Sequence, residues 1–185
     1  MSHIISNHWL VKARHVLSPN CDKRNEEDDI SLIVIHCISL PPGHFGTHYI
    51  DQLFTNCLDP DEHPYFKKIH RLNVSSHVLI SRDGNITQYV PFNLRAWHAG
   101  QSCYKGRACC NNFSIGIELE GTDTGLYTNE QYQQLTDITA VLLKNYISLS
   151  TSDITGHSNI APERKQDPGP GFDWNCFHDM LTKKL

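Results

Sequence analysis

The apolar run from Ile30 to His36 constrains the fold more than any other stretch of the sequence. Its residues, Ile30-Ser31-Leu32-Ile33-Val34-Ile35-His36, are almost continuously apolar and rich in β-branched side chains. A strand covered on both faces has this pattern, so we expect a central strand of a buried sheet. His36 closes the run, where open α/β sheets commonly place their functional sites. A purely structural histidine is the alternative interpretation.

Strand and helix signals alternate along the rest of the chain. Asp83-Gly84-Asn85 tolerates positive φ, so the segments 77–81 and 86–90 are predicted to form a β-hairpin. Thr128-Asn129-Glu130-Gln131 fits a capping box that opens a helix. The core stripe predicted for this helix is Tyr132, Leu135, Ile138, Leu142 and Tyr146. A short helix over 49–54, a short strand over 153–155 and a final amphipathic helix over 173–185 complete an α/β domain with a mixed sheet.

Two segments are expected to be loops. The acidic stretch 21–29 is typical of a solvated loop. The segment 91–112 is long for a compact domain, and such loops tend to be functional or disordered. Its aromatic residues and glycines, including Trp97 and His98, favour an ordered role facing a substrate.

The predicted strand 113–120 has two unlike faces. Period-2 alternation places Phe113, Ile115, Ile117 and Leu119 on one face and Ser114, Gly116, Glu118 and Glu120 on the other. A glycine inside a strand often marks close approach by a ligand or another backbone. We expect Gly116 to leave open space in front of the Glu118 carboxylate and Glu120 to face water.

Composition narrows the classes of function. A chain of 185 residues is expected to form one domain, residues 1–185, with a substantial core. The net charge of -4 gives no reason to expect nucleic acid or an anionic membrane as partner. Seven cysteines without a CxxC pair indicate reduced thiols. The sequence also shows no signal-peptide pattern and no membrane-spanning run. Together with the reduced cysteines, this predicts a cytoplasmic protein.

The segment 155–171 combines a histidine, a lysine and an aspartate with three prolines. Pro168 restricts the backbone of Asp167, and a defined carboxylate position suits a metal ligand or a catalytic group. The sequence also contains 12 histidines, and histidine is the commonest metal ligand. We interpret His157 and Asp167 as zinc ligands whose third partner lies far upstream. A polar surface loop is the alternative.

His36, His157 and Asp167, if they converge, would leave the fourth position of a tetrahedral zinc ion open for water, as catalytic sites require. Glu118 is the candidate for moving the proton of that water to a departing amide nitrogen. Lys165 is the candidate for stabilising charge on the carbonyl oxygen. A competing site from Cys103, Cys109, Cys110 and His98 has no recognisable ligand spacing.

The sequence resembles the AmpD-type N-acetylmuramyl-L-alanine amidases from Trp9 to Phe177. The resemblance is carried by Val34-Ile35-His36, 38–43, Arg82-Asp83-Gly84, 88–92, 95–100, 114–123 and the segment 155–171. It implies a mixed sheet flanked by helices, one zinc ion on His36, His157 and Asp167, and catalytic roles for Glu118 and Lys165. It also implies cleavage of a 1,6-anhydro-N-acetylmuramyl peptide between the lactyl group and L-alanine, in peptidoglycan recycling.

The chain departs from this family in the residues expected around the substrate. Cys37 stands where relatives carry asparagine, and Asn73 and Cys109 stand where they carry arginines that hold the stem peptide. Arg107, with Lys105, is the candidate to bind the peptide carboxylates instead. Two alternatives to a recycling amidase remain open: a muropeptide-binding module without activity, and a zinc hydrolase acting on intact wall outside the cytoplasm.

Overall fold

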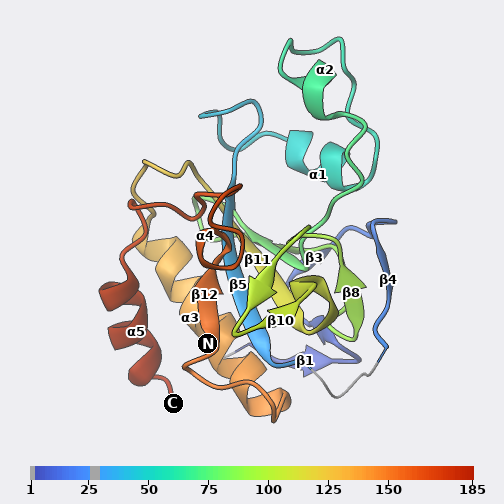
Figure 1. Ribbon diagram of the computed structural model, residues 1–185. Helices are drawn as coiled ribbons and strands as arrows, with labels where there is room; N and C mark the ends of the chain where they lie inside the picture. Colours follow the sequence, from blue (N-terminus) through green and yellow to red (C-terminus); the bar gives the residue numbers. More distant parts are fainter. Residues whose placement is uncertain (1–2, 26–29) are drawn as a thin grey trace.

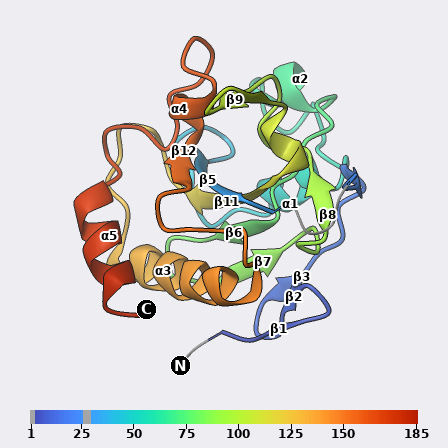
Figure 2. The ribbon, with the colours of Figure 1, turned by 60° about the horizontal axis from the view of Figure 1, so that its bottom comes forward.

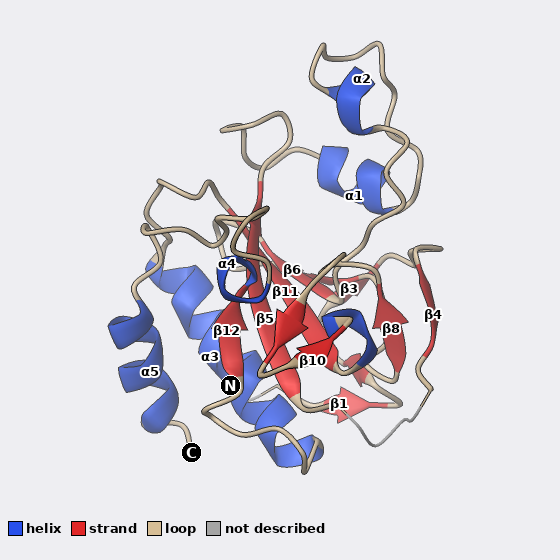
Figure 3. Cartoon of the chain, viewed as in Figure 1, coloured by secondary structure: helices blue, strands red, loops and turns tan. Residues whose placement is uncertain are grey.

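A six-stranded mixed sheet forms the centre of the computed structural model, which describes residues 3–25 and 30–185. Its strands, in spatial order, are β12 (Ile154–Gly156), β5 (Leu32–Ile38), β11 (Ser114–Glu120), β6 (Val78–Ile80), β7 (Ile86–Gln88) and β3 (Arg14–His15). All neighbours are parallel except β6 and β7, which form the predicted hairpin. The predicted α/β class with a mixed sheet is therefore confirmed (Figure 3).

Strand β5 is buried on both faces, as its sequence predicts. Ile33 and Ile35 join the large core under the helices, whereas Leu32 and Val34 join a smaller cluster on the opposite face. The strand continues to Ile38, so His36 lies inside it near the carboxyl end and does not close it.

Strand β11 pairs in register with β5 and is buried along its whole length. The expectation that Glu120 faces water is wrong. Its side chain is 3% exposed and accepts hydrogen bonds from the backbone N–H groups of Gly46 and Arg82. Two loops from distant parts of the chain close over this face, which an isolated strand pattern does not reveal.

Helices α3 (Asn129–Asn145) and α5 (Trp174–Thr182) cover one side of the sheet (Figures 1 and 2). The predicted capping box is present: Thr128 Oγ1 accepts from the backbone N–H of Gln131, and Gln131 reaches back to the backbone N–H of Thr128. Of the predicted stripe, four residues are buried and Tyr146 packs against the same core. None of the helices in the described ranges is long and apolar enough to cross a membrane.

The segment between β5 and β6 extends beyond the sheet at the carboxyl end of β5 (Figure 1). It contains the predicted helix α1 (Tyr49–Phe54) and a short helix, α2 (Phe66–Ile69), that the sequence did not suggest. Leu53, Phe54 and Phe66 are buried in a separate cluster with Leu79 and Tyr89. This second core fixes the segment to the sheet.

The segment 91–112 is ordered but is not a simple loop. It contains β8 (Leu94–Ala96), the hairpin of β9 (Cys103–Tyr104) and β10 (Arg107–Ala108), and the 3-10 turn η1 (Cys110–Asn112). Likewise, part of the segment 155–171 is the short helix α4 (His157–Ile160).

Part of the segment that was expected to be an acidic loop forms a strand. Cys21–Lys23 forms β4, which pairs with β8, and the following Arg24 is buried. The rest of the predicted loop includes residues 26–29, which lie outside the described residues. A small hairpin, β1 (Ile5–Ser6) with β2 (Trp9–Leu10), begins the chain.

Removing the cap of α3 should destabilise the protein. Thr128 Oγ1 both caps this helix and donates to the Arg82 carbonyl, so Thr128→Ala is expected to lower the free energy of unfolding by about 1–2 kcal/mol. Denaturant titration measures the loss. The exposed Thr151→Ala variant serves as control, and equal stability of the two variants would contradict the assigned cap.

Candidate active site

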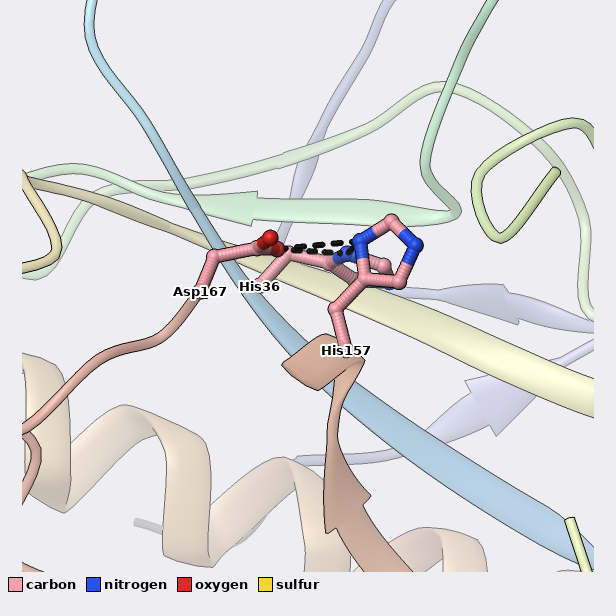
Figure 4. A group of neighbouring side chains, drawn as sticks. All are labelled: His36, His157 and Asp167. Carbon is pink, nitrogen blue, oxygen red and sulfur yellow. Dashed lines mark hydrogen bonds and ion pairs between the residues drawn. The ribbon is translucent and has the colours of Figure 1, made fainter. Parts of the chain in front are cut away.

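His36, His157 and Asp167 meet at the carboxyl end of β5 (Figure 4). His36 projects from β5, His157 begins α4 directly after β12, and Asp167 follows ten residues later. The two Nδ1 atoms lie 2.9 Å apart, and each lies 3.1 Å from Asp167 Oδ2. The three residues that the sequence proposed as one ligand set are therefore brought together.

The outer nitrogen of His157 fixes which atom this ring presents to the cluster. Its Nε2 lies 3.1 Å from the Ala99 carbonyl oxygen, which can only accept a hydrogen bond. In the neutral ring Nε2 therefore carries the hydrogen, and Nδ1 turns a lone pair toward His36 and Asp167. Arg164 donates to the same carbonyl at 2.7 Å and to the Gln101 carbonyl at 2.8 Å, which holds this loop in place.

The cluster has the composition and spacing of a metal site. Zinc bonds to histidine and carboxylate of about 2.0–2.2 Å would separate tetrahedral ligand atoms by roughly 3.3–3.5 Å. The observed triangle is slightly tighter and would need only small side-chain adjustments. Two imidazoles with one carboxylate suit zinc better than calcium or magnesium, which prefer oxygen-rich sites. The group can hold a metal ion.

Burial and mutual contact perturb the titration of the cluster. Burial lowers the pKa of His36 to about 4, against the opposing effect of Asp167. For Asp167, burial alone would raise the pKa, but its close polar contacts with His157 and His36 outweigh burial and hold that pKa well below its usual value. At neutral pH the site thus offers a neutral His36 imidazole and an ionised Asp167 carboxylate, the forms that bind a cation.

Glu118 lies beside His36 because the two residues are paired across the parallel strands β11 and β5. Its carboxyl is buried, and Oε2 has no hydrogen-bond partner in the part of the chain that the structure describes. Burial, followed by the charge of Asp167, raises the pKa of Glu118 well above its usual value, while Lys165 opposes the shift. A carboxyl poised in this way is suited to exchanging protons.

The cluster opens into a cavity of about 520 Å³, within the usual range for small-ligand sites. Glu118 and the three clustered residues line it together with Lys165, Arg164 and Trp97. The segment between β5 and β6 supplies an apolar wall that includes Leu53, Phe54, Tyr65, Ile69, Leu72 and Val74. Sequence reasoning missed this wall and Arg164, although Arg164 directly precedes the selected Lys165.

The predicted substrate contacts divide into two groups. Trp97 and His98 line the cavity. Arg107 is exposed, stacks over the Phe113 ring at 3.9 Å and is not among the lining residues, while Lys105 pairs with Asp153 at 2.8 Å. Asn73 and Cys109, which stand in place of arginines, are also exposed and outside the lining.

The expectation of open space at Gly116 is wrong. The His98 ring fills that space: a Cβ on Gly116 would lie 2.5 Å from His98 Cγ, so only glycine allows the ring to pack against β11. The glycine does mark a close approach, but the approaching group belongs to the protein.

Cysteines contribute little to the site. The rival set is dispersed: Cys103 and Cys109 are exposed, Cys110 is buried, and no group of metal-ligating residues including them is found among the described residues. Cys37 lines the cavity next to His36, and burial raises the pKa of its thiol to about 12, although a hydrogen bond with Tyr127 opposes this. The thiol therefore stays protonated at neutral pH.

Comparison with known proteins agrees with this fold and site. The chain belongs to the N-acetylmuramoyl-L-alanine amidase family, which matches residues 26–170. Within that family it groups with the AmpD-type 1,6-anhydro-N-acetylmuramyl-L-alanine amidases. It is 58% identical to AmpD of Enterobacter cloacae over 179 residues, covering 97% of this chain and 95% of the relative.

Solved structures of related enzymes share the architecture. A crystal structure of a selenomethionine AmpD derivative matches with a TM-score of 0.94 and 56% identity, over 96% of this chain and 99% of that one. The amidase AmiD from E. coli, in complex with the substrate anhydro-N-acetylmuramic acid-L-Ala-D-gamma-Glu-L-Lys, matches with a TM-score of 0.62 and 25% identity. That match covers 97% of this chain and 65% of AmiD.

The metal-free protein should lose stability as the pH falls from about 6.5 to 4. Burial lowers the pKa values of His36, His77 and His98, whereas an unfolded histidine titrates near 6.5. In this window the unfolded state binds more protons than the folded state. Each such histidine therefore lowers the free energy of unfolding by up to about 1.4 kcal/mol per pH unit. The raised pKa of Glu118 acts in the opposite direction, but it is one group against three.

Urea titrations from pH 7.5 to 5 measure this effect. His77→Gln, which removes one of the three rings, should show a smaller fall in the free energy of unfolding. A stability that does not change with pH would contradict the buried, neutral state of these histidines.

Proposed function

We propose that this amidase hydrolyses the amide bond between the lactyl group of 1,6-anhydro-N-acetylmuramic acid and L-alanine of the stem peptide, as one domain spanning residues 1–185. The observation that carries this proposal is the convergence of His36, His157 and Asp167 beside Glu118 in a cavity. The family membership and the substrate named for the AmiD complex support the choice of bond.

One zinc ion on His36, His157 and Asp167 is the proposed cofactor. When bound, zinc polarises a carbonyl oxygen and lowers the pKa of a bound water to about 7. The three side chains supply two ring nitrogens and a carboxylate oxygen; both histidines are buried, and Asp167 is partly buried.

Glu118 is the proposed proton carrier. Its carboxylate would take a proton from the attacking water and deliver it to the nitrogen of L-alanine as the amide breaks. A raised pKa favours a carboxyl that can both take up and release a proton, and Oε2 of Glu118 has no hydrogen-bond partner among the described residues.

Lys165 is the proposed electrostatic partner of the reaction. It lines the same cavity, and its positive charge opposes the rise in the pKa of Glu118. A positive charge there favours the negative charge that develops on the carbonyl oxygen.

The substrate is proposed to occupy the cavity between Trp97 and the apolar wall. Trp97 offers an aromatic surface for the sugar or the peptide. His98 and Arg107 remain candidate substrate contacts from the sequence. The position of Arg107 outside the cavity lining would restrict it to the distal part of a stem peptide.

The compartment is proposed to be the cytoplasm, where a recycling enzyme meets released muropeptides. All seven cysteines are free, in keeping with a reducing compartment. A receptor that binds muropeptides without cleaving them is the rival function. The complete set of candidate ligands, together with Glu118, favours the enzyme.

Replacing Asp167 with alanine should remove both zinc and activity, because the carboxylate is the only anionic member of the ligand set. Metal analysis and turnover of an anhydro-muropeptide, followed by mass spectrometry of the products, test this. Asp179→Ala, an exposed carboxylate on α5, is the matched control. Full zinc occupancy in the Asp167 variant would show that the ligand assignment is wrong.

Replacing Glu118 with glutamine should leave zinc in place and lower kcat by about 10²–10⁴-fold, because the amide cannot exchange protons. Steady-state kinetics beside zinc analysis separate the two effects. Glu163→Gln, an exposed change in the loop that precedes Lys165, is the control. A kcat close to that of the unchanged enzyme would remove the proton-carrying role.

A further inference from the structure

His98 and Ser114 form a chain of hydrogen bonds behind His36. His36 Nε2 lies 2.9 Å from His98 Nδ1, and His98 Nε2 lies 3.1 Å from Ser114 Oγ. Ser114 Oγ in turn lies 2.6 Å from the carbonyl oxygen of Cys110. This series of hydrogen bonds runs from the Cys110 carbonyl to His36 in the candidate metal cluster.

The direction of every hydrogen bond in this chain follows from its first acceptor. The Cys110 carbonyl can only accept, so the Ser114 hydroxyl must donate to it. Ser114 Oγ then accepts the hydrogen of His98 Nε2. A neutral His98 carries no second hydrogen, so its Nδ1 accepts from His36 Nε2.

The surroundings of His98 favour the neutral ring. The ring bonds only to His36 and Ser114 among the described residues, and no carboxylate of these residues contacts it. The backbone N–H of His98 donates to Asn111 Oδ1. His77 packs against it edge-on, and Gly116 leaves just enough room for the ring. A positive charge on His98 would therefore contact no carboxylate in the described part of the chain.

From this geometry we propose that His98 and Ser114 are positioning residues that lock His36 in the tautomer with hydrogen on Nε2. His36 Nδ1 then presents a lone pair to the cluster, as His157 Nδ1 does. Without this lock, His36 could place its hydrogen on Nδ1 and donate it to Asp167, which would satisfy the cluster internally and compete with a metal ion.

The two imidazoles differ in how they are fixed. The backbone carbonyl of Ala99 fixes the tautomer of His157. No single side-chain replacement removes this acceptor. The acceptor for His36 Nε2 is instead the side chain of His98, and the side chain of Ser114 orients His98. The proposal rests on the zinc function proposed above, and it assigns His98 a role behind the ligand that differs from its predicted contact with substrate.

Two variants and a rescue test the proposal. His98→Leu removes the acceptor for His36, and Ser114→Ala removes the acceptor that orients His98. Both should weaken zinc binding, with about a 10- to 100-fold loss for His98→Leu, as is typical when a partner of a metal-bound histidine is lost. His98→Gln should recover most of the affinity, because its amide can accept from His36 and donate to Ser114.

Zinc affinity is measured with zinc ions alone, in competition with a chromophoric chelator. His3→Leu is the control, because it removes a buried histidine that bonds Gln134 and does not line the cavity. Long-range ¹H–¹⁵N correlation spectra of the metal-free protein report the tautomer directly. His36 should carry hydrogen on Nε2 in the unchanged protein and on both nitrogens, as a mixture, in His98→Leu.

The two readouts separate this proposal from the zinc function. An unchanged protein that binds no zinc would reject the function, while the spectra would still decide the tautomer. A hydrogen on Nδ1 of His36 in the unchanged protein, or unaltered zinc affinity in the variants, would overturn the lock. If His98→Leu does not fold, Ser114→Ala, which removes only a hydroxyl, gives the decision.

Discussion

The in-register pairing of β5 with β11 is the constraint on which the rest of the site depends. It places His36 and Glu118 side by side on parallel strands whose residues are largely buried. A shift of one residue would turn either side chain to the opposite face, into the core under α3. The apolar residues Ile33, Ile35, Ile115 and Ile117 therefore secure the register, and with it the placement of Glu118 beside the candidate ligand His36.

Burying so many ionisable groups is costly unless each one has a partner. Asp167 is compensated by the two histidines, His157 by the Ala99 carbonyl, and Glu120 by two backbone N–H groups. Glu118 is the exception, with one oxygen that lacks a partner among the described residues. Uncompensated burial of a carboxyl is expected of a group that exchanges protons, which is the role proposed for Glu118.

Local patterns predicted the elements whose signal lies within a few residues: the buried β5, the β6–β7 hairpin, the cap at Thr128 and the stripe on α3. The convergence of His36, His157 and Asp167 was predictable because the chemistry of a metal site restricts the residue types. The failures have a common cause. Glu120, Gly116 and Cys21–Lys23 are each defined by partners more than ten residues away, and an alternating pattern shows which residues share a face but not what covers it.

If the proposed substrate binds here, we expect its stem peptide to be recognised differently from the arginine-based mode that the family resemblance implies. Asn73 and Cys109 are uncharged, exposed and outside the cavity lining, and Arg107, the candidate to replace the arginines, is also outside it. Arg164 does line it, but one of its terminal nitrogens already donates to two carbonyls, which leaves the remaining N–H groups for a ligand. The apolar wall from Leu53 to Val74 faces the same space. Binding in this enzyme should accordingly depend more on apolar contact and less on ion pairing, and so be less sensitive to salt.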